Sequence, residues 1–259
     1  MRVASLGFAT DLMVRELAGS SVRDAGDHLV IETPRNPTFY WGNFILVGDD
    51  FANHQRWLAV FAREFPRAAH IAIGLDGAAQ SDALVAGYLA AGLGLELVRV
   101  LTATALAVPK SAPGVVCRPL AGDRDWEQAL DLRYESDADA SAEHRLFLRR
   151  QVEQERELTR TGDAAWFGAF VDGRMRAGVG IVSDGQGLAR FQNVETDPAF
   201  RRRGLARALI TAAGRHAFAA LRARTLVIRA DPDYHAIDLY RSLGFADAGT
   251  EIELSKAGH

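Results

Sequence analysis

A basic turn between a predicted strand and a predicted helix carries the residue types best suited to chemistry. Three arginines at positions 201–203 precede Gly204, and apolar residues then recur with the period of an amphipathic helix. The first backbone amides of a helix have no partner within it and form the positive end of its dipole. Because Gly204 and Ala206 add little bulk, an anion such as a diphosphate can approach those amides. The alternative is a solvated arginine run that caps an ordinary helix.

The neighbouring segments place this turn between a strand and a helix. Residues 191–196 favour a strand, which Asp197 and Pro198 end, and the helix begins at Leu205. The turn at 201–206 reads Arg-x-x-Gly-x-Ala. It resembles the pyrophosphate-binding motif of the GNAT superfamily of N-acetyltransferases, which is Arg or Gln-x-x-Gly-x-Gly or Ala.

A second signature of that family follows downstream. Residues 226–228 favour a strand, and 234–243 a helix. The sequence AIDLYRSLGF at 236–245 is similar to the family pattern Ala-φ-x-Leu-Tyr-x-x-x-Gly-Phe. Gly244 suits the end of this helix, where a positive φ is needed. The two signatures together give a resemblance to GNAT acetyltransferases that covers about residues 115 to 255.

The predicted order of elements from residue 115 is the order that the resemblance implies. A strand at 115–120 precedes helices at 123–133 and 143–159, and a hairpin turns through Asp172-Gly173. The motif strand, the motif helix and a strand–helix–strand unit follow. We therefore expect an α/β (α+β) GNAT fold, with a mixed, mostly antiparallel central sheet flanked by helices.

The first half of the chain repeats this pattern in a weaker form. The sequence HIAIGLD at 70–76 parallels TLVIRAD at 225–231, and YLAAGL at 88–93 parallels YRSLGF at 240–245. We therefore predict two GNAT-like units in tandem. One is a degenerate domain without a cofactor cradle at 1–110, and the other is a catalytic acetyltransferase domain at 115–259. An unrelated α/β segment packed on the enzyme is the alternative for the first half.

The first half lacks the basic, glycine-containing turn of the second half at the corresponding position, residues 48–53. This segment reads Gly-Asp-Asp-Phe-Ala-Asn where the cradle would stand, and its two carboxylates would repel a diphosphate. We therefore expect coenzyme A to bind once per chain, in the second half. Before this turn we predict an aromatic-rich strand at 38–47. The first half would be structural or would wall the substrate pocket, with Tyr40 and Trp41 as contributors.

Acetyl transfer from a thioester to an amine needs a polarised thioester, a deprotonated amine and a proton for the departing thiolate. By resemblance, the motif strand splays from its parallel neighbour, and backbone groups at 194–196 hold the pantetheine arm and the thioester oxygen. Amides at 202–207 hold the diphosphate. Tyr240 matches the family tyrosine that protonates the thiolate, and a phenol keeps its proton at pH 7. Packing in the core is the alternative role for this tyrosine.

Two further residues, Glu195 and Asp233, also bear on the chemistry. Glu195 lies in the strand that would flank the thioester and is the first candidate for the general base. A pairing role for Glu195, or a water chain in place of a direct base, is the alternative. Asp233 stands where the family has Asn, and a carboxylate cannot donate the hydrogen bond that the amide gives.

The predicted site residues form two sets. The catalytic pair is Tyr240 and Glu195. The cofactor-binding set is Val194, Glu195, Thr196, Arg201, Arg202, Arg203, Gly204, Leu205, Ala206, Arg207 and Asp233. These residues predict an N-acetyltransferase that uses acetyl-CoA as cosubstrate, without a metal, to acetylate a primary amine of an unidentified small molecule or peptide. A non-catalytic GNAT-like protein that binds or senses acyl-CoA is the alternative.

An acidic connection between the first two helices lies where the resemblance places the acceptor pocket. It begins at Tyr134, and its carboxylates are Glu135, Asp137, Asp139 and Glu143. Four carboxylates would attract a cationic acceptor such as a polyamine, an aminoglycoside or a basic peptide end. The alternative is a solvated acidic loop.

The composition is that of a soluble globular protein. A formal net charge of −3 gives no reason to expect a nucleic-acid or membrane partner. The sequence contains neither an 18-residue apolar run nor a signal-peptide core, so we expect a cytoplasmic protein. We expect a monomer or a homodimer. The single cysteine, Cys117, excludes an internal disulfide and lies in an apolar strand, which favours packing over a role as nucleophile.

Overall fold

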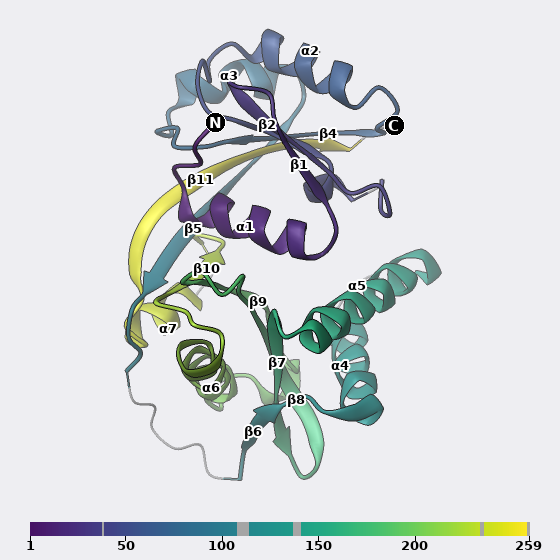
Figure 1. Cartoon of the computed structure of the whole chain (residues 1–259), viewed down its shortest axis with the longest axis vertical. Helices are drawn as coiled ribbons and strands as arrows, with labels where there is room; N and C mark the ends of the chain where they lie inside the picture. The colour runs from purple at the N-terminus through teal and green to yellow at the C-terminus, as the bar shows by residue number, and fades with distance from the viewer. Residues whose placement is uncertain (38, 108–113, 137–140, 234–235, 258–259) are drawn as a thin grey trace. The chain divides into compact units, whose positions relative to one another are not determined.

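The hairpin of the second half forms at the position that the local sequence predicts. The computed structural model describes residues 1–37, 39–107, 114–136, 141–233 and 236–257 (Figure 1). Strands β7 (Ala164–Val171) and β8 (Arg174–Val182) join through Asp172 and Gly173, whose φ angles are 50° and 77°. A two-residue hairpin loop of this kind requires two consecutive positive φ angles. This turn fixes a register that sets Trp166 opposite Gly180, where a Cβ would lie 2.4 Å from the indole ring.

The chain forms two compact units that do not coincide with its two halves. The first unit comprises Met1–Leu101, Arg229–Ile237 and Asp247–His259, and the second comprises Thr102–Ile228 and Asp238–Ala246. The last strand, β11 (Ala246–Ala257), therefore contributes mainly to the first unit, across the predicted boundary between 110 and 115.

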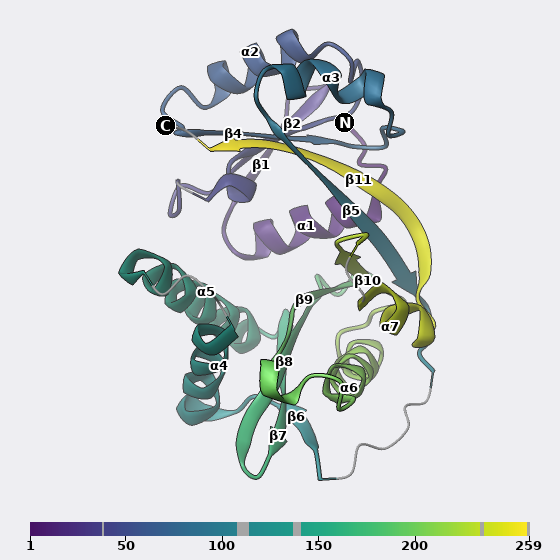
Figure 2. The same ribbon diagram turned by 180° about the vertical axis from the view of Figure 1, so that it is seen from behind.

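The first unit is a sheet with helices on both faces. Its elements are α1 (Leu6–Leu17), β1 (Ser21–Asp24), β2 (His28–Glu32), the 3-10 turn η1 (Tyr40–Gly42), β3 (Phe44–Val47), α2 (His54–Glu64), β4 (His70–Leu75), α3 (Asp82–Ala90) and most of β5 (Gly94–Ala103). Helix α1 covers one face, and α2 and α3 cover the other (Figures 1 and 2). Strand β3 is buried along its whole length, as expected of a strand covered on both faces.

Strand β11 is held in the first unit by backbone pairing and by buried charges. It runs antiparallel to β4 from Ile252 opposite Leu75 to Ala257 opposite His70. Its carboxylates Glu251 and Glu253 both pair with Arg229, with Nε of Arg229 2.8 Å from Oε2 of Glu251. All three side chains are largely buried, so these ion pairs compensate charges that would otherwise be costly in the interior.

The predicted strand over 38–47 is wrong in its central part. Residues Tyr40–Gly42 form a 3-10 turn, and strand β3 begins only after it. Asn43 explains the difference, because its Oδ1 accepts a hydrogen bond from the Thr33 amide at 3.0 Å and its Nδ2 donates to two carbonyls of the preceding loop at 2.9 Å. These bonds fix a turn that overrides the strand propensity of the aromatic residues.

The second unit has the element order that the sequence predicts. Its elements are β6 (Val116–Pro119), α4 (Gly122–Ser136), α5 (Ala142–Thr161), β7, β8, β9 (Leu188–Thr196), the 3-10 turn η2 (Pro198–Phe200), α6 (Leu205–Ala220), most of β10 (Thr225–Ala230) and α7 (Ala236–Ser242). Helix α6 covers one face of strands β7 to β9, and α4 and α5 cover the other (Figure 2). The apolar side chains of these helices face the strands, as their 3.6-residue period requires.

The two halves of the chain share one pairing pattern. In each, an antiparallel strand precedes a parallel pair joined by a helix, as β3–α2–β4 and as β9–α6–β10. The described strands follow the hydrogen-bonded order β1-β2-β3-β4-β11-β5-β10-β9-β8-β7-β6. The predicted mixed, mostly antiparallel sheet flanked by helices is therefore confirmed.

Candidate functional site

Strand β9 is irregular at the position where the site is predicted. Between two matched pairs, β8 advances two residues, from Gly178 to Gly180, while β9 advances three, from Gln192 to Glu195. The extra residue makes a β-bulge, and Asn193 within it has a φ of 48°. Bulges redirect side chains and interrupt pairing, and Glu195 is the first residue of β9 that pairs with β8 again after this one.

The parallel ladder between β9 and β10 is short. Its described pairs run from Leu188 opposite Thr225 to Arg190 opposite Val227. Residues 191–196 of β9 extend beyond these pairs. The backbone at 194–196, predicted to hold the pantetheine arm, thus lies in the part of β9 that follows both the end of the ladder and the bulge.

The turn after β9 presents an open helix N-terminus. Gly204 is the N-cap of α6, with a φ of 83°, and no side chain caps this helix. The first amide that bonds back into the helix is that of Ala208, which donates to the Gly204 carbonyl at 3.1 Å. A Cβ at Gly204 would meet no atom within 4 Å, so the space above the turn is open. These features match an anion cradle.

The arginines of the turn are exposed and partly ordered by an aromatic ring. The guanidinium of Arg203 lies 4.6 Å from the ring centre of Phe200, and that of Arg176 lies 4.3 Å from the same centre. Arg176 also donates to Asp197, from Nη1 to Oδ2 at 2.8 Å, and Asp197 caps η2. The basic side chains are thus gathered beside the open helix N-terminus, which strengthens its positive field.

Tyr240 is packed within the second unit. The residue is 5% exposed, and its ring lies edge-on to that of Phe245 with centroids 6.3 Å apart. Its carbonyl accepts the amide of Phe245 at 3.2 Å, which closes the end of α7. Arg207 in the first turn of α6 donates to the Ser242 hydroxyl at 2.7 Å. This bond ties the cradle helix to the helix that carries Tyr240.

Asp233 lies in the turn before α7 and is exposed. Its amide donates to Oδ1 of Asp231 at 2.8 Å, which makes a local side-chain turn. Asp233 falls in the first unit, whereas the other predicted site residues fall in the second.

Glu195 belongs to a buried network of charges drawn from three elements. Arg133 on α4 bonds both oxygens of Glu155 on α5, from Nη1 to Oε1 at 2.9 Å and from Nη2 to Oε2 at 3.2 Å. The same Nη2 bonds Oε1 of Glu195 at 3.1 Å. Nδ2 of Asn193 donates to Oε1 of Glu155 at 2.6 Å, so Glu155 also holds the bulge. One guanidinium therefore serves two carboxylates.

Burial shifts the proton equilibria of this network. The side chains of Arg133 and Glu155 are each 7% exposed, whereas that of Glu195 is 17% exposed. Burial raises the pKa of Glu155 to about 6, against the opposing effect of Arg133. Burial also raises the pKa of Glu195, again against Arg133. Of the three charged side chains, Glu195 is thus the most exposed, and it is a better proton acceptor than an ordinary glutamate.

Sequence reasoning missed Arg133, Glu155 and Asn193. A usable signal was present for Glu155, because it continues the spacing of the inward residues Leu148 and Val152 on α5. A charged residue on an apolar helix face must find a partner or remain neutral. The sequence does not say which partner it finds.

The acidic connection predicted to line the acceptor pocket falls largely outside the described residues. Asp137 and Asp139 lie outside them, and so does the side chain of Glu143. Tyr134 at its start donates its hydroxyl hydrogen bond to the Arg145 carbonyl at 3.2 Å, and the Arg145 guanidinium lies 5.0 Å from the Tyr134 ring centre. The cationic-acceptor hypothesis for this connection stays a prediction.

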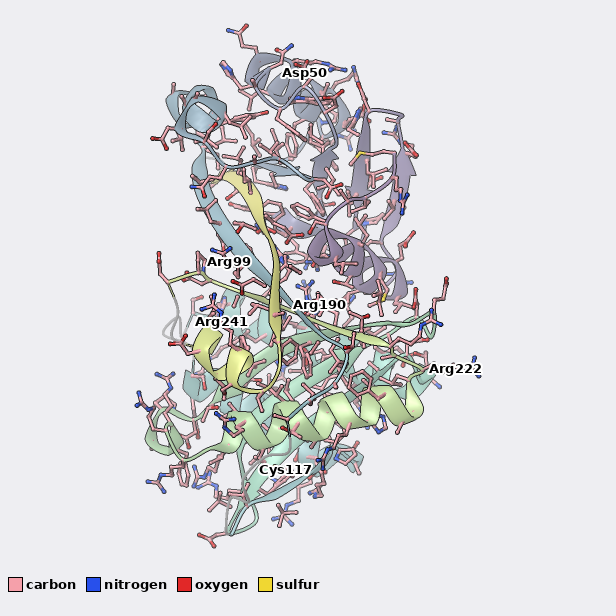
Figure 3. The ribbon with its side chains drawn as sticks, turned by 90° about the vertical axis from the view of Figure 1, so that its left-hand side faces the viewer. Asp50, Arg99, Cys117, Arg190, Arg222 and Arg241 are labelled. Atoms are coloured by element: carbon pink, nitrogen blue, oxygen red, sulfur yellow. The ribbon has the colours of Figure 1, made fainter. Side chains whose placement is uncertain are left out.

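The corresponding turn of the first half is closed by its own side chains. Asn53 is the N-cap of α2, and its side chain accepts the Arg56 amide at 3.4 Å. Asp50, labelled in Figure 3, accepts hydrogen bonds from Asn53 at 3.1 Å and from the Arg56 guanidinium at 3.2 Å. A capped and acidic helix N-terminus is unsuited to a diphosphate, in contrast to the open N-terminus at Gly204.

Comparison with known proteins identifies relatives of the second half by sequence and of the whole chain by fold. The sequence model of the Acetyltransferase (GNAT) family matches residues 126–245. No curated protein is detectably similar in sequence. A functionally unknown conserved protein from Staphylococcus epidermidis has a TM-score of 0.76 at 12% identity, over 93% of this chain and 96% of that one.

Two further solved structures carry names that match the sequence prediction. A GCN5-related N-acetyltransferase from Kribbella flavida has a TM-score of 0.67 at 17% identity, over 100% of this chain and 98% of that one. A tandem GNAT protein from the clavulanic acid biosynthesis pathway has a TM-score of 0.56 at 14% identity, over 95% and 88%. Such identities establish a shared fold. The predicted GNAT fold in tandem form is therefore confirmed.

None of the helices that the structure describes is both long enough and apolar enough to cross a bilayer.

Proposed function

Because this chain belongs to the acetyltransferase (GNAT) family through residues 126–245, we propose that it is an acetyl-CoA-dependent N-acetyltransferase that acts on a primary amine. The observation that carries the proposal is the uncapped N-terminus of α6, with Gly204 in the left-handed region, directly after the bulged strand β9. In this proposal the amides at 202–207 bind the diphosphate of acetyl-CoA. The backbone at 194–196 binds the pantetheine arm and polarises the thioester carbonyl.

Glu195 is proposed to remove the proton of the attacking amine. The nitrogen of the neutral amine forms a bond to the thioester carbonyl carbon, and its N–H proton passes to the Glu195 carboxylate. Two features support this role, namely the position of Glu195 beside the bulge and the raised pKa that burial gives its carboxyl. A base with a pKa nearer the working pH is more effective in such a transfer.

Tyr240 is proposed to supply a proton to the leaving thiolate. The carbon–sulfur bond breaks, the sulfur takes the phenolic proton, and solvent restores that proton to Tyr240 while accepting the proton held by Glu195. The atoms then balance, with an amide and free coenzyme A as products. Support comes from the link between α7 and the first turn of α6 through Arg207 and Ser242, which keeps Tyr240 with the cradle.

A thiol-release assay tests the proposal. Purified protein is mixed with acetyl-CoA and, in separate reactions, with alkylamines, polyamines, aminoglycosides and peptides with free N-termini. Free coenzyme A is measured with a thiol reagent, and each product is weighed by mass spectrometry. We expect thiol release with at least one amine, together with a product heavier by one acetyl group. Binding of acetyl-CoA without thiol release for any amine would instead support the non-catalytic acyl-CoA-binding or sensing alternative.

A further inference from the structure

The geometry around Arg133 divides one positive charge unequally between two carboxylates. Both carboxylate oxygens of Glu155 accept hydrogen bonds from the Arg133 guanidinium, whereas Glu195 accepts one hydrogen bond from it, at Oε1. A bidentate pair between arginine and a carboxylate is stronger and more rigid than a single contact. Glu155 therefore competes with Glu195 for the only guanidinium of this network.

No other strong charge faces Glu195 from the elements described around it. The charged groups that act most strongly on Glu155 are Arg133 and Glu195, and Arg133 is the one that acts on Glu195. On α5 the other partner of Arg133 is the neutral Gln151, at 3.2 Å. On β8 the residue opposite Glu195 is Gly178, where a Cβ would lie 3.4 Å from Oε1 of Glu195. The glycine adds no charge beside the carboxylate.

We propose that Glu155 is a positioning residue that keeps Glu195 available as a base, by occupying Arg133 and by holding the β9 bulge through Asn193. This inference rests on the proposed acetyl transfer and extends it to a residue on α5. Without Glu155, Arg133 would turn its whole charge on Glu195 and stabilise its ionised form. Glu195 would then be a weaker base. Asn193, at a φ of 48°, would also lose the acceptor that fixes its side chain.

The test is Glu155→Gln, which keeps the size of the side chain and its ability to accept hydrogen bonds. The matched control is Glu157→Gln, two residues along α5, where the side chain is 58% exposed and pairs with Arg160. Benzylamine, or another alkylamine that the wild type acetylates, serves as acceptor. The logarithm of kcat/KM is followed across the acid range. It should rise with a slope of two where both the amine and Glu195 lose protons, and with a slope of one above the pKa of Glu195.

We expect Glu155→Gln to move the break between these slopes to lower pH by about one unit or more, because Arg133 no longer shares its charge with a second carboxylate. The rate above the break should fall, while the affinity for acetyl-CoA is kept. Glu157→Gln should leave the break in place. In a Glu195→Gln background, the added Glu155→Gln change should have no further effect on the profile. If Glu155→Gln is slower but its slope changes at the same pH as in the wild type, Glu155 has only a structural role and the inference is overturned.

A second measurement does not depend on catalysis. Side-chain carboxyl carbons of 13C-labelled glutamate are titrated by NMR, and the Glu195 signal is assigned by its loss in Glu195→Gln. Its midpoint should be lower in Glu155→Gln than in the wild type, and an equal or higher midpoint would overturn the inference. If no amine is acetylated, the proposed function fails, and this titration still decides whether Glu155 controls the charge of Glu195.

Discussion

Replacing Gly204 with glutamate is the sharpest perturbation of the proposed cradle. Gly204 has a φ of 83°, and a Cβ there would meet no atom within 4 Å. The new side chain therefore meets no protein atom and, apart from the backbone strain of a positive φ, conflicts only with a ligand. It brings a carboxylate to the point where the diphosphate is proposed to lie. Gly162, at the C-terminal end of α5, has a φ of 88° and the same open surroundings, so Gly162→Glu is a matched control.

The two variants should lose similar stability and different amounts of affinity. An L-residue in the left-handed region costs about 1–2 kcal/mol, which lowers Tm by roughly 2–8 °C for a chain of this size. A carboxylate about 4 Å from one phosphate charge is repelled by about 4 kcal/mol at an effective permittivity near 20. Salt and solvent screen an exposed turn. If about 2 kcal/mol remains, the affinity of Gly204→Glu for acetyl-CoA falls about 30-fold.

Calorimetric titration with acetyl-CoA and thermal unfolding measure these effects. The wild type should bind one acetyl-CoA per chain, because the corresponding helix of the first half is capped by Asn53. Gly162→Glu should keep that affinity at its lowered Tm. Undiminished affinity in Gly204→Glu would refute the cradle assignment. Two sites per chain would refute the assignment of the first half as lacking one.

Three further predictions concern single side chains. Tyr240→Phe should keep the affinity for acetyl-CoA and lower turnover by about 10²–10⁴-fold, since only the proton donor is lost; steady-state rates check this, and an unchanged rate with chemistry limiting would assign Tyr240 to the core. Arg133→Met should lower the free energy of unfolding by about 3–5 kcal/mol, because it leaves two buried carboxylates unpaired. Urea unfolding measures the loss, which should shrink toward pH 5 because Glu155, with a pKa of about 6, then takes up a proton; a loss independent of pH would contradict the charge argument. Burial also raises the pKa of Glu253 from an ordinary value of 4.5 to about 7, despite Arg229. As pH rises, the Glu253 carboxyl therefore loses its proton in the unfolded chain at a lower pH than in the folded protein. The stability contributed by Glu253 thus falls as pH rises from about 4.5 to about 7. Glu253→Gln should flatten that part of the stability profile, and a profile parallel to the wild type would show that Glu253 does not titrate there.

The sequence by itself determined the parts of the protein whose conformation depends on neighbouring residues. The hairpin at Asp172-Gly173 and the helix N-terminus at Gly204 both follow from residues that tolerate a positive φ. The GNAT signature at 236–245 likewise lies within one helix and its C-terminal stop. Such features are decided within a few residues, so the second-half element order and the uncapped turn at Gly204 could be predicted before any packing was known.

Local propensity failed where the hydrogen bonds of a side chain decided the backbone. The aromatic residues Tyr40 and Trp41 favour a strand, but Asn43 and its bonds to the preceding loop impose a 3-10 turn. The membership of β11 in the first unit is likewise not a local property. Its pairing with β4 joins segments far apart in the chain, and no periodicity within β11 specifies which strand it will adjoin.

The charges of the candidate site were decided by tertiary structure alone. Glu195 was predicted from its place in a strand, but its partner Arg133 lies 62 residues away, and Glu155 lies 22 residues from Arg133. The sequence shows that each is charged and suggests which helix face is inward. Only the packing of α4 and α5 against the bulged strand brings one guanidinium to two carboxylates, and their burial, which no local pattern sets, then shifts the proton equilibria.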